Sequence, residues 1–201
     1  MLTTLVFDIG RVLLHWDVDL LYARLIPDIA ARRLFLAEVL PPSWNLEQDR
    51  GRSWSEAEDE RIALFPQHED LIRAFRRYWH ETIPGAIDEN VRVLEAGLSA
   101  GIPSYAITNF AADTFAEASE RFGFLKRFHG RIVSGEEGLL KPDPAIYALF
   151  LSRFGKRAEE CLFMDDSRAN IDAAAALGFA TIHVTPETNL LAEVRRQGFM
   201  I

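Results

Sequence analysis

The fold class follows from residues 2–10, which read LTTLVFDIG. Residues 2–7 are rich in β-branched and aromatic side chains and lack the 3.6-residue apolar stripe of a helix, so they predict a buried strand. The strand ends at Asp8, which predicts a carboxylate at its exit. Four later stretches have the same character and are also predicted strands: residues 103–108, 130–134, 161–164 and 181–184.

Helical patterns separate these predicted strands. Residues 87–98 carry apolar side chains at helical spacing, residues 143–154 begin with Asp-Pro, and residues 169–177 stop before a glycine. Strands that alternate with helices imply crossover connections and a mostly parallel sheet covered on both faces. Ligands of such α/β sheets bind beyond the carboxyl ends of the strands.

One long segment, residues 15–84, breaks this alternation. It contains no convincing strand but several helical stripes, so we interpret it as an inserted helical cap. The predicted domain division is therefore a core of residues 1–14 and 85–201 and a cap of residues 15–84. The four tryptophans fall within or near this cap, where we expect them to pack a small apolar core: Trp16, Trp44, Trp54 and Trp79.

Composition narrows the classes of function. The 201 residues are 49% hydrophobic and 26% charged, which is typical of one globular domain with room for an insertion. A net charge of −8 disfavours nucleic acid as a partner, although a local cation or metal can still hold one small phosphate. The apolar runs are too short to span a membrane, and the chain start lacks a basic stretch, so we expect a cytoplasmic protein without a membrane partner. The lone cysteine, Cys161, is predicted to be a buried core thiol.

Four polar clusters stand at the ends of apolar stretches. If the strands lie side by side, these clusters converge on one edge of the sheet. Because like charges in one cleft raise each other's pKa, the carboxylates of Asp8, Asp165 and Asp166 require a divalent cation and a lysine to stay ionised. An oxygen-only ligand set favours magnesium. The clusters are Asp8-Ile9-Gly10, Thr108-Asn109, Lys141-Pro142-Asp143-Pro144, and Asp165-Asp166-Ser167 with Asn170.

These clusters and their flanks resemble a known family. Residues 7–13 (FDIGRVL), 107–109 (ITN), 138–147 (GLLKPDPAIY) and 163–171 (FMDDSRANI) are similar, in order, to the four motifs of haloacid dehalogenase-like hydrolases. The resemblance implies a doubly wound, Rossmann-like α/β core and, for the insertion, the small-cap subgroup. It also implies a magnesium-dependent phosphatase that hydrolyses a small phosphate ester through an aspartyl-phosphate intermediate.

The resemblance assigns a role to each motif residue. Asp8 would be the nucleophile and a magnesium ligand, and Lys141 would neutralise charge on Asp8 and on the phosphate. Thr108 and Asn109 would orient the phosphoryl oxygens, with Lys141 completing the substrate-binding set.

The remaining motif residues would build the metal site. Asp166 would bind magnesium directly, and Gly10 would contribute its backbone carbonyl. Asp165 would bind the ion through water or orient the site, and Asn170 would support these residues without contacting the ion.

The sequence departs from the family at Gly10. Most phosphatases of the family carry at this position an aspartate that protonates the leaving oxygen, a contribution worth about 10² to 10⁴ in rate. His15 and Asp17 are candidate donors, but we interpret them as loop residues. Some relatives with a glycine here resemble sugar-1-phosphate phosphatases, whose anomeric leaving group departs more readily, so a sugar phosphate is the expected substrate class.

Two alternatives remain open from the sequence. A metal-independent 2-haloacid dehalogenase would use the same aspartate, but the Asp165-Asp166 pair disfavours it. A non-catalytic relative that binds a phosphorylated ligand is favoured by Gly10 and disfavoured by the otherwise complete set of polar residues. We interpret Arg11 as an exposed loop residue, His183 as an ordinary strand histidine, and the basic run Arg73, Arg76 and Arg77 as a solvated face.

Overall fold

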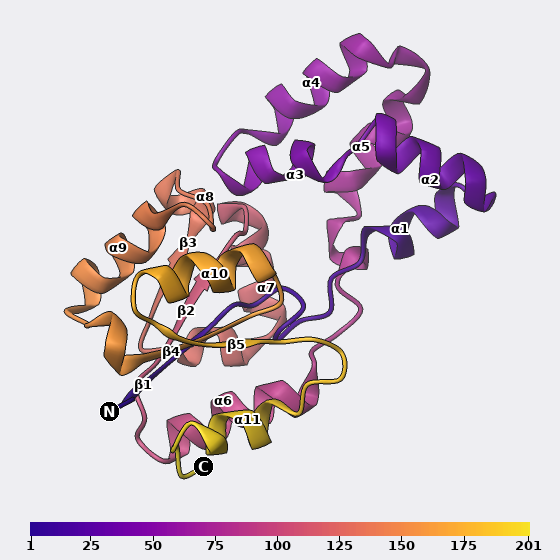
Figure 1. Cartoon of the computed structure of the whole chain (residues 1–201). Coiled ribbons are helices and arrows are strands. Elements are labelled where there is room, and N and C mark those ends of the chain that lie inside the picture. The colour runs from indigo at the N-terminus through magenta and orange to yellow at the C-terminus, as the bar shows by residue number, and fades with distance from the viewer.

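The computed structural model describes residues 1–201 and contains one five-stranded sheet in which every pair of neighbouring strands is parallel (Figure 1). The strand order is β3-β2-β1-β4-β5. The predicted α/β class with a parallel sheet is therefore confirmed. The strands are β1 (Thr4–Phe7), β2 (Ser104–Thr108), β3 (Gly130–Val133), β4 (Cys161–Asp165) and β5 (Ala180–His183).

Strand β1 lies at the centre of this sheet, and all of its residues are buried. Phe7, its last residue, is in register with Ala106 of β2 and Met164 of β4. The chain stays in the sheet one step further, since the Asp8 amide donates to the Met164 carbonyl at 2.8 Å. Because the strands are parallel, the residues that follow β1, β2 and β4 emerge at the same edge.

Helices cover both faces of the sheet, as a doubly wound fold requires. Alternation along β1 sends Leu5 and Phe7 to one face and Val6 to the other. The first face packs against α6 (Asp88–Ser99), α7 (Ala112–Arg121) and α11 (Leu190–Arg196). The second packs against α9 (Pro144–Phe154) and α10 (Arg168–Ala176).

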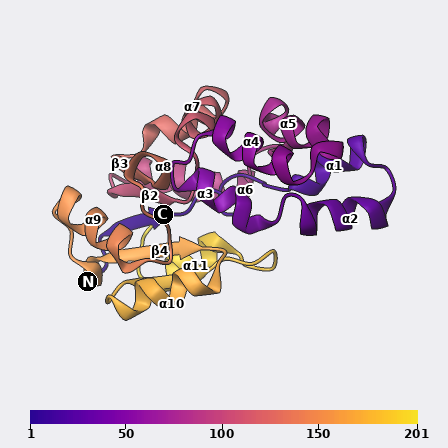
Figure 2. The same ribbon diagram turned by 90° about the horizontal axis from the view of Figure 1, so that it is seen from above.

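Between β1 and α6 the chain forms only helices. They make a lobe beyond the carboxyl edge of the sheet (Figure 1), and Figure 2 shows the lobe extending to one side of the core. We call this lobe the cap. Its elements are α1 (Val18–Leu25), α2 (Ile29–Glu38), α3 (Pro42–Asp49), α4 (Trp54–Leu64), η1 (Pro66–His68), α5 (Glu69–Arg77) and η2 (Trp79–Thr82).

Aromatic packing builds the small core of the cap. The Trp44 ring meets Trp54 and Phe75 edge-on at centroid distances of 6.0 and 5.4 Å, and Trp54 stacks on Phe75 at 5.6 Å. Trp44 and Trp54 therefore have the packing role expected from the sequence. Trp79 is also buried in this core and meets Phe110 edge-on at 5.5 Å, and Trp16 packs against the same core; both in addition line a cavity.

Polar contacts tie the cap to the core. Arg76 of α5, predicted to belong to a solvated face, instead pairs with Asp113 at 3.1 Å and with Glu117, both on α7. The Trp54 indole also donates to Asp113, at 3.1 Å. These contacts hold α4 and α5 against α7.

Two chain segments connect the cap to the core. Leu14 forms isolated β-bridges with Gly10 and Ala86, so these two segments run side by side.

Helices α6, α9 and α10 lie within one residue of their predicted positions. None of the helices combines the length and apolarity that crossing a bilayer demands.

Cys161 begins β4 and is fully buried, as the sequence predicts. Burial raises the pKa of its thiol to about 12, so at about pH 8 almost no thiolate is present. We expect the native protein to resist a thiol-specific reagent and the urea-unfolded protein to react with one equivalent. Rapid stoichiometric labelling of the native protein would contradict the packing around β4.

Candidate active site

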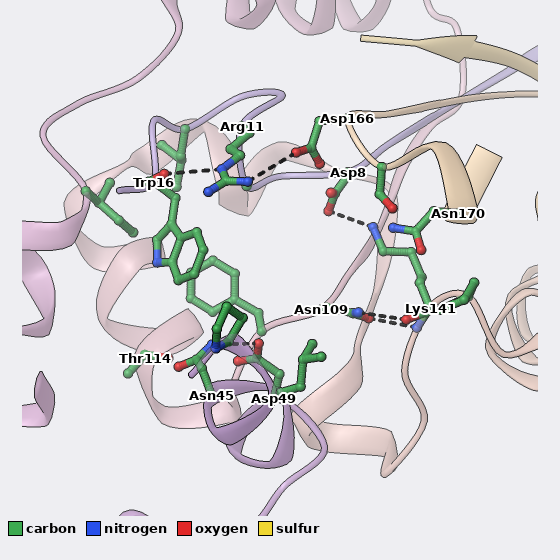
Figure 3. A pocket seen from close by; sticks show the side chains of 18 of the residues that line it. Asp8, Arg11, Trp16, Asn45, Asp49, Asn109, Thr114, Lys141, Asp166 and Asn170 are labelled. Atoms are coloured by element: carbon green, nitrogen blue, oxygen red, sulfur yellow. Dashed lines mark hydrogen bonds and ion pairs between the residues drawn. The ribbon is translucent and has the colours of Figure 1, made fainter. Parts of the chain in front are cut away.

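A cavity of ≈490 Å³ opens where the carboxyl edge of the sheet faces the cap (Figure 3). Its wall includes residues from the loops after β1, β2 and β4 and from cap helix α3. Six of the residues predicted for the site line it: Asp8, Gly10, Asn109, Lys141, Asp166 and Asn170. Thr108 and Asp165, the other two, are fully buried behind this wall.

Lys141 is the centre of the charged cluster. Its Nζ lies 2.8 Å from Asp8 Oδ1 and 2.6 Å from Asp165 Oδ2, and it donates to the Ile107 carbonyl at 2.9 Å. Burial opposes the charged form of Lys141, but the two carboxylates prevail and raise its pKa. The ammonium is therefore permanent at physiological pH.

Asp165 is held by donors on every side. Its Oδ1 accepts from the Ser167 amide at 2.8 Å and from Asn170 Nδ2 at 2.9 Å, while Oδ2 accepts from Lys141. These bonds occupy the carboxylate with the protein's own groups. The predicted roles of Asp165 and Asn170 in orienting the site stay predictions.

Asp8 and Asp166 face the cavity with fewer compensating donors. The Ile9 amide donates to Asp8 Oδ1 at 2.7 Å, and the guanidinium of Arg11 lies 3.9 Å from Asp166 Oδ2. Burial raises the pKa of Asp8, Lys141 opposes it, and the charges of Asp165 and Asp166 raise it further. Burial, and then the charge of Asp165, likewise raises the pKa of Asp166. The cluster therefore carries more negative than positive charge.

The charge and spacing of the cluster fit a divalent cation. Carboxylate oxygens of Asp8, Asp165 and Asp166 all lie within 4.8 Å of one another, close enough to share one ion. The three carboxylates outnumber the Lys141 ammonium and the largely exposed Arg11 guanidinium, so the cluster keeps a net negative charge that a divalent cation would offset. The donor atoms are all oxygens, as magnesium prefers. The carbonyl oxygen of Gly10, on the cavity wall, accepts no hydrogen bond within the protein.

Asn109 braces the loop that carries Lys141. Its Oδ1 accepts from the Lys141 amide at 2.8 Å, and its Nδ2 donates to the Lys141 carbonyl at 2.9 Å. Both polar atoms of the side chain are thus engaged by the protein, and its predicted contact with phosphoryl oxygens stays a prediction. Thr108 differs, because its buried hydroxyl has no partner at all.

The cap contributes a face of α3 to the cavity. Pro42, Asn45, Leu46 and Asp49 line it, and their spacing of three, four and seven residues places them on one side of the helix. The sequence predicted no role in the site for these four residues. The available signal was the polar pair Asn45 and Asp49 one helical turn apart, which resembles any solvated helix face.

Arg11 also lies on the cavity wall, although the sequence marked it as an exposed loop residue. Its side chain is 57% exposed, and its guanidinium stacks on the Trp16 ring at 5.2 Å (Figure 3). Trp79 and Thr114 complete this part of the wall. His15 and Asp17 do not line it; Asp17 caps α1 by accepting from the Asp19 amide.

The fold and the site together define a class: a doubly wound α/β protein with a buried carboxylate-lysine cluster beneath a helical cap. A family model of haloacid dehalogenase-like hydrolases matches residues 4–178, most of the chain. The protein belongs to this family, as the resemblance of its four motifs predicted.

Several relatives carry the names of phosphatases. The chain is 32% identical to the sesquiterpene phosphatase astK of Aspergillus oryzae over 96 residues, which cover 48% of this chain and 49% of that protein. It is 34% identical to a phosphoglycolate phosphatase of Pectobacterium atrosepticum over 86 residues, 42% of this chain and 36% of the relative. The chain thus spans half or less of the length of these relatives.

Solved structures share the fold over nearly the whole chain. A HAD family enzyme from Bacteroides thetaiotaomicron, solved as a magnesium complex, superposes with a TM-score of 0.76 at 17% identity and covers 96% of this chain and 98% of its own. The L-2-haloacid dehalogenase of Xanthobacter autotrophicus gives a TM-score of 0.66 at 19% identity, covering 98% and 84%. At these identities the likeness concerns the fold alone.

Thr108 and Asn109 offer a test of the site's architecture. Thr108→Val removes a buried hydroxyl without a partner, so we expect stability in urea to stay equal or to rise by about 1 kcal/mol. Asn109→Ala removes both bonds to the Lys141 backbone, and we expect a loss of about 1–3 kcal/mol. A marked loss of stability in Thr108→Val would reveal a structural role for the hydroxyl.

Proposed function

We propose that this protein is a magnesium-dependent phosphatase that hydrolyses a small phosphate ester through an aspartyl-phosphate on Asp8. The observation that carries the proposal is the cluster in which Lys141 holds Asp8 and Asp165 at 2.8 and 2.6 Å, with Asp166 alongside at the cavity wall. We further propose that residues 1–14 and 85–201 act as the catalytic core and residues 15–84 as its cap.

Magnesium would be held by Asp8, Asp166 and the Gly10 carbonyl. The net negative charge of the cluster and the free Gly10 carbonyl support this assignment. When bound, the ion would supply positive charge next to the phosphoryl oxygens. Asp165 and Asn170 would keep their orienting role, since their polar atoms are bonded to each other.

In the first step, a carboxylate oxygen of Asp8 attacks phosphorus and the ester P–O bond breaks, its electron pair leaving with the alcohol oxygen. Lys141 neutralises charge that spreads over the phosphoryl oxygens, and it holds Asp8 in position by the same contact. Water then attacks phosphorus, which releases phosphate and restores the Asp8 carboxylate. The unpartnered hydroxyl of Thr108 would donate to a phosphoryl oxygen, while Asn109 supports the loop of Lys141.

We infer that the substrate is a sugar phosphate. The cavity joins the charged cluster to a wall that includes Trp16, Trp79 and Asn45, which offers aromatic faces and an amide group for a polyol. Its volume suits a ligand of that size. The names of the phosphatase relatives are consistent with a small phosphate ester in general.

Replacement of the nucleophile is the direct test. We expect Asp8→Asn to lower magnesium-dependent turnover of phosphate esters by about 10³-fold or more, since no bond to phosphorus can form. Lys141→Met should cause a comparable loss, together with a loss of stability, because it leaves Asp165 without its partner. Equal rates for the wild type and Asp8→Asn would refute covalent catalysis.

Removal of the metal separates this function from its rivals. We expect a chelator to abolish phosphatase activity and added magnesium to restore it, because the three clustered carboxylates carry a net negative charge that the ion would offset. The same preparation is assayed on 2-haloacids. Dehalogenation that survives the chelator, without phosphatase activity, would establish a dehalogenase; binding of phosphate without turnover would establish a non-catalytic protein.

A further inference from the structure

The proposed hydrolysis requires a proton for the leaving oxygen, and the residue two positions after the nucleophile, Gly10, has none to give. The titratable side chains on the cavity wall are few, and most are engaged. Asp8, Lys141 and Asp166 belong to the charged cluster, and the guanidinium of Arg11 keeps its protons at any physiological pH. Asp49 is the remaining one.

Asp49 ends α3 and reaches the cavity from the cap side, across from the cluster (Figure 3). Its Oδ2 accepts a hydrogen bond from Asn45 Nδ2 at 3.0 Å, and it forms no ion pair with any lysine or arginine. Because no cation pairs with Asp49, only neutral amide donors stabilise the ionised form of its carboxyl.

The core fixes this end of α3 in place. Ser134, the first residue of α8 (Ser134–Glu137), donates from its hydroxyl to the Asp49 carbonyl and accepts from the Phe110 amide at 2.8 Å. Ser134 thus links Asp49 to the loop that follows Asn109. The position of the carboxyl is therefore set by contacts with the catalytic core as well as by the cap.

We propose that Asp49 is the general acid and base of the reaction, a residue supplied by the cap in place of the one that Gly10 lacks; this inference rests on the proposed phosphatase function. As Asp8 attacks phosphorus and the ester bond breaks, the Asp49 carboxyl gives its proton to the departing oxygen. The resulting Asp49 carboxylate takes a proton from the water that attacks the aspartyl-phosphate. One turnover consumes one ester and one water and returns Asp8 and Asp49 to their starting states.

The electrostatic setting supports this role. Burial raises the pKa of Asp49 to about 7, the Ala111 backbone amide opposes this, and the negative charge of Asp8 adds to it. The carboxyl is therefore largely protonated below about pH 7 and can exchange its proton near neutrality. Four charged groups share the cavity with Asp49: Asp8, Arg11, Lys141 and Asp166. Acidic residues of the neighbouring helices α8 and α4 are paired elsewhere: Glu136 with Arg131, Glu137 with Arg153, and Glu60 with Arg52.

The test compares Asp49→Asn with Glu47→Gln. Both variants remove one carboxylate from α3, but Glu47 is exposed and does not line the cavity. The substrates are aryl phosphates of graded leaving-group basicity, from dinitrophenyl to phenyl phosphate, with saturating magnesium. These esters carry no sugar hydroxyls, so a residue that only binds the sugar would not alter their rates selectively.

We expect Asp49→Asn to lower kcat/KM for phenyl phosphate by about 10²-fold or more. The kcat/KM for dinitrophenyl phosphate should stay nearly unchanged, because dinitrophenolate departs without a proton. Glu47→Gln should match the wild type throughout the series. In the wild type, kcat/KM for phenyl phosphate should fall above about pH 7 as Asp49 loses its proton, and this limb should be absent in Asp49→Asn. Retained turnover of dinitrophenyl phosphate also shows that the variant is folded.

An equal loss across the series, or no loss at all, would overturn the role of Asp49 as the acid. Asp49→Ser also removes the carboxyl that accepts from Asn45. It should reproduce the steeper dependence of kcat/KM on the basicity of the leaving group. If the wild type hydrolyses no phosphate ester, the proposed function fails instead, so the two failures are distinct.

Discussion

The buried ammonium of Lys141, shared between Asp8 and Asp165, is the interaction on which the site depends. All three side chains are removed from solvent, so each charge is costly unless the others are present at hydrogen-bond distance. The cluster also couples distant parts of the chain, because Asp8 follows β1, Asp165 ends β4 and Lys141 precedes α9. A change in any one of these segments therefore alters the charge balance of the site.

The parallel sheet makes this cluster possible. The central strand β1 is flanked by β2 and β4, so the chain exits of three strands converge where the helix-covered faces end. Hydrogen bonds from Ser167 and Asn170 then fix the Asp165 carboxylate, and the bond between Asn109 and the Lys141 amide fixes the loop that carries Lys141. The result is a preorganised set of oxygens with too little positive charge, which is the property a metal site requires before its ion arrives.

The cap completes the cavity and, in our proposal, the chemistry. Helix α3 closes the wall opposite the charged cluster, and Arg76 and Trp54 attach the neighbouring cap helices to α7. If the proton donor resides on α3, catalysis requires the cap to be seated, and substrates would be hydrolysed only in the closed cavity. Such an arrangement would connect selection of the substrate, which contacts the cap, to delivery of the proton.

The sequence by itself determined the sheet, its helices and the residues of the charged cluster. Short apolar strands with Asp8, Thr108 and Asp165 at or just after their carboxyl ends leave little freedom in how a parallel sheet assembles, and the alternation of strands and helices is visible in the sequence. Only the tertiary structure decided which cap residues reach the cavity, that Asn109 braces the Lys141 loop, and that Arg11 lies on the wall. The physical reason is that helical periodicity marks the buried face of a cap helix but does not say which partner buries it. Asn45 and Asp49 of α3 face the cavity only because the cap packs against the core, and the linear sequence pattern does not encode this packing.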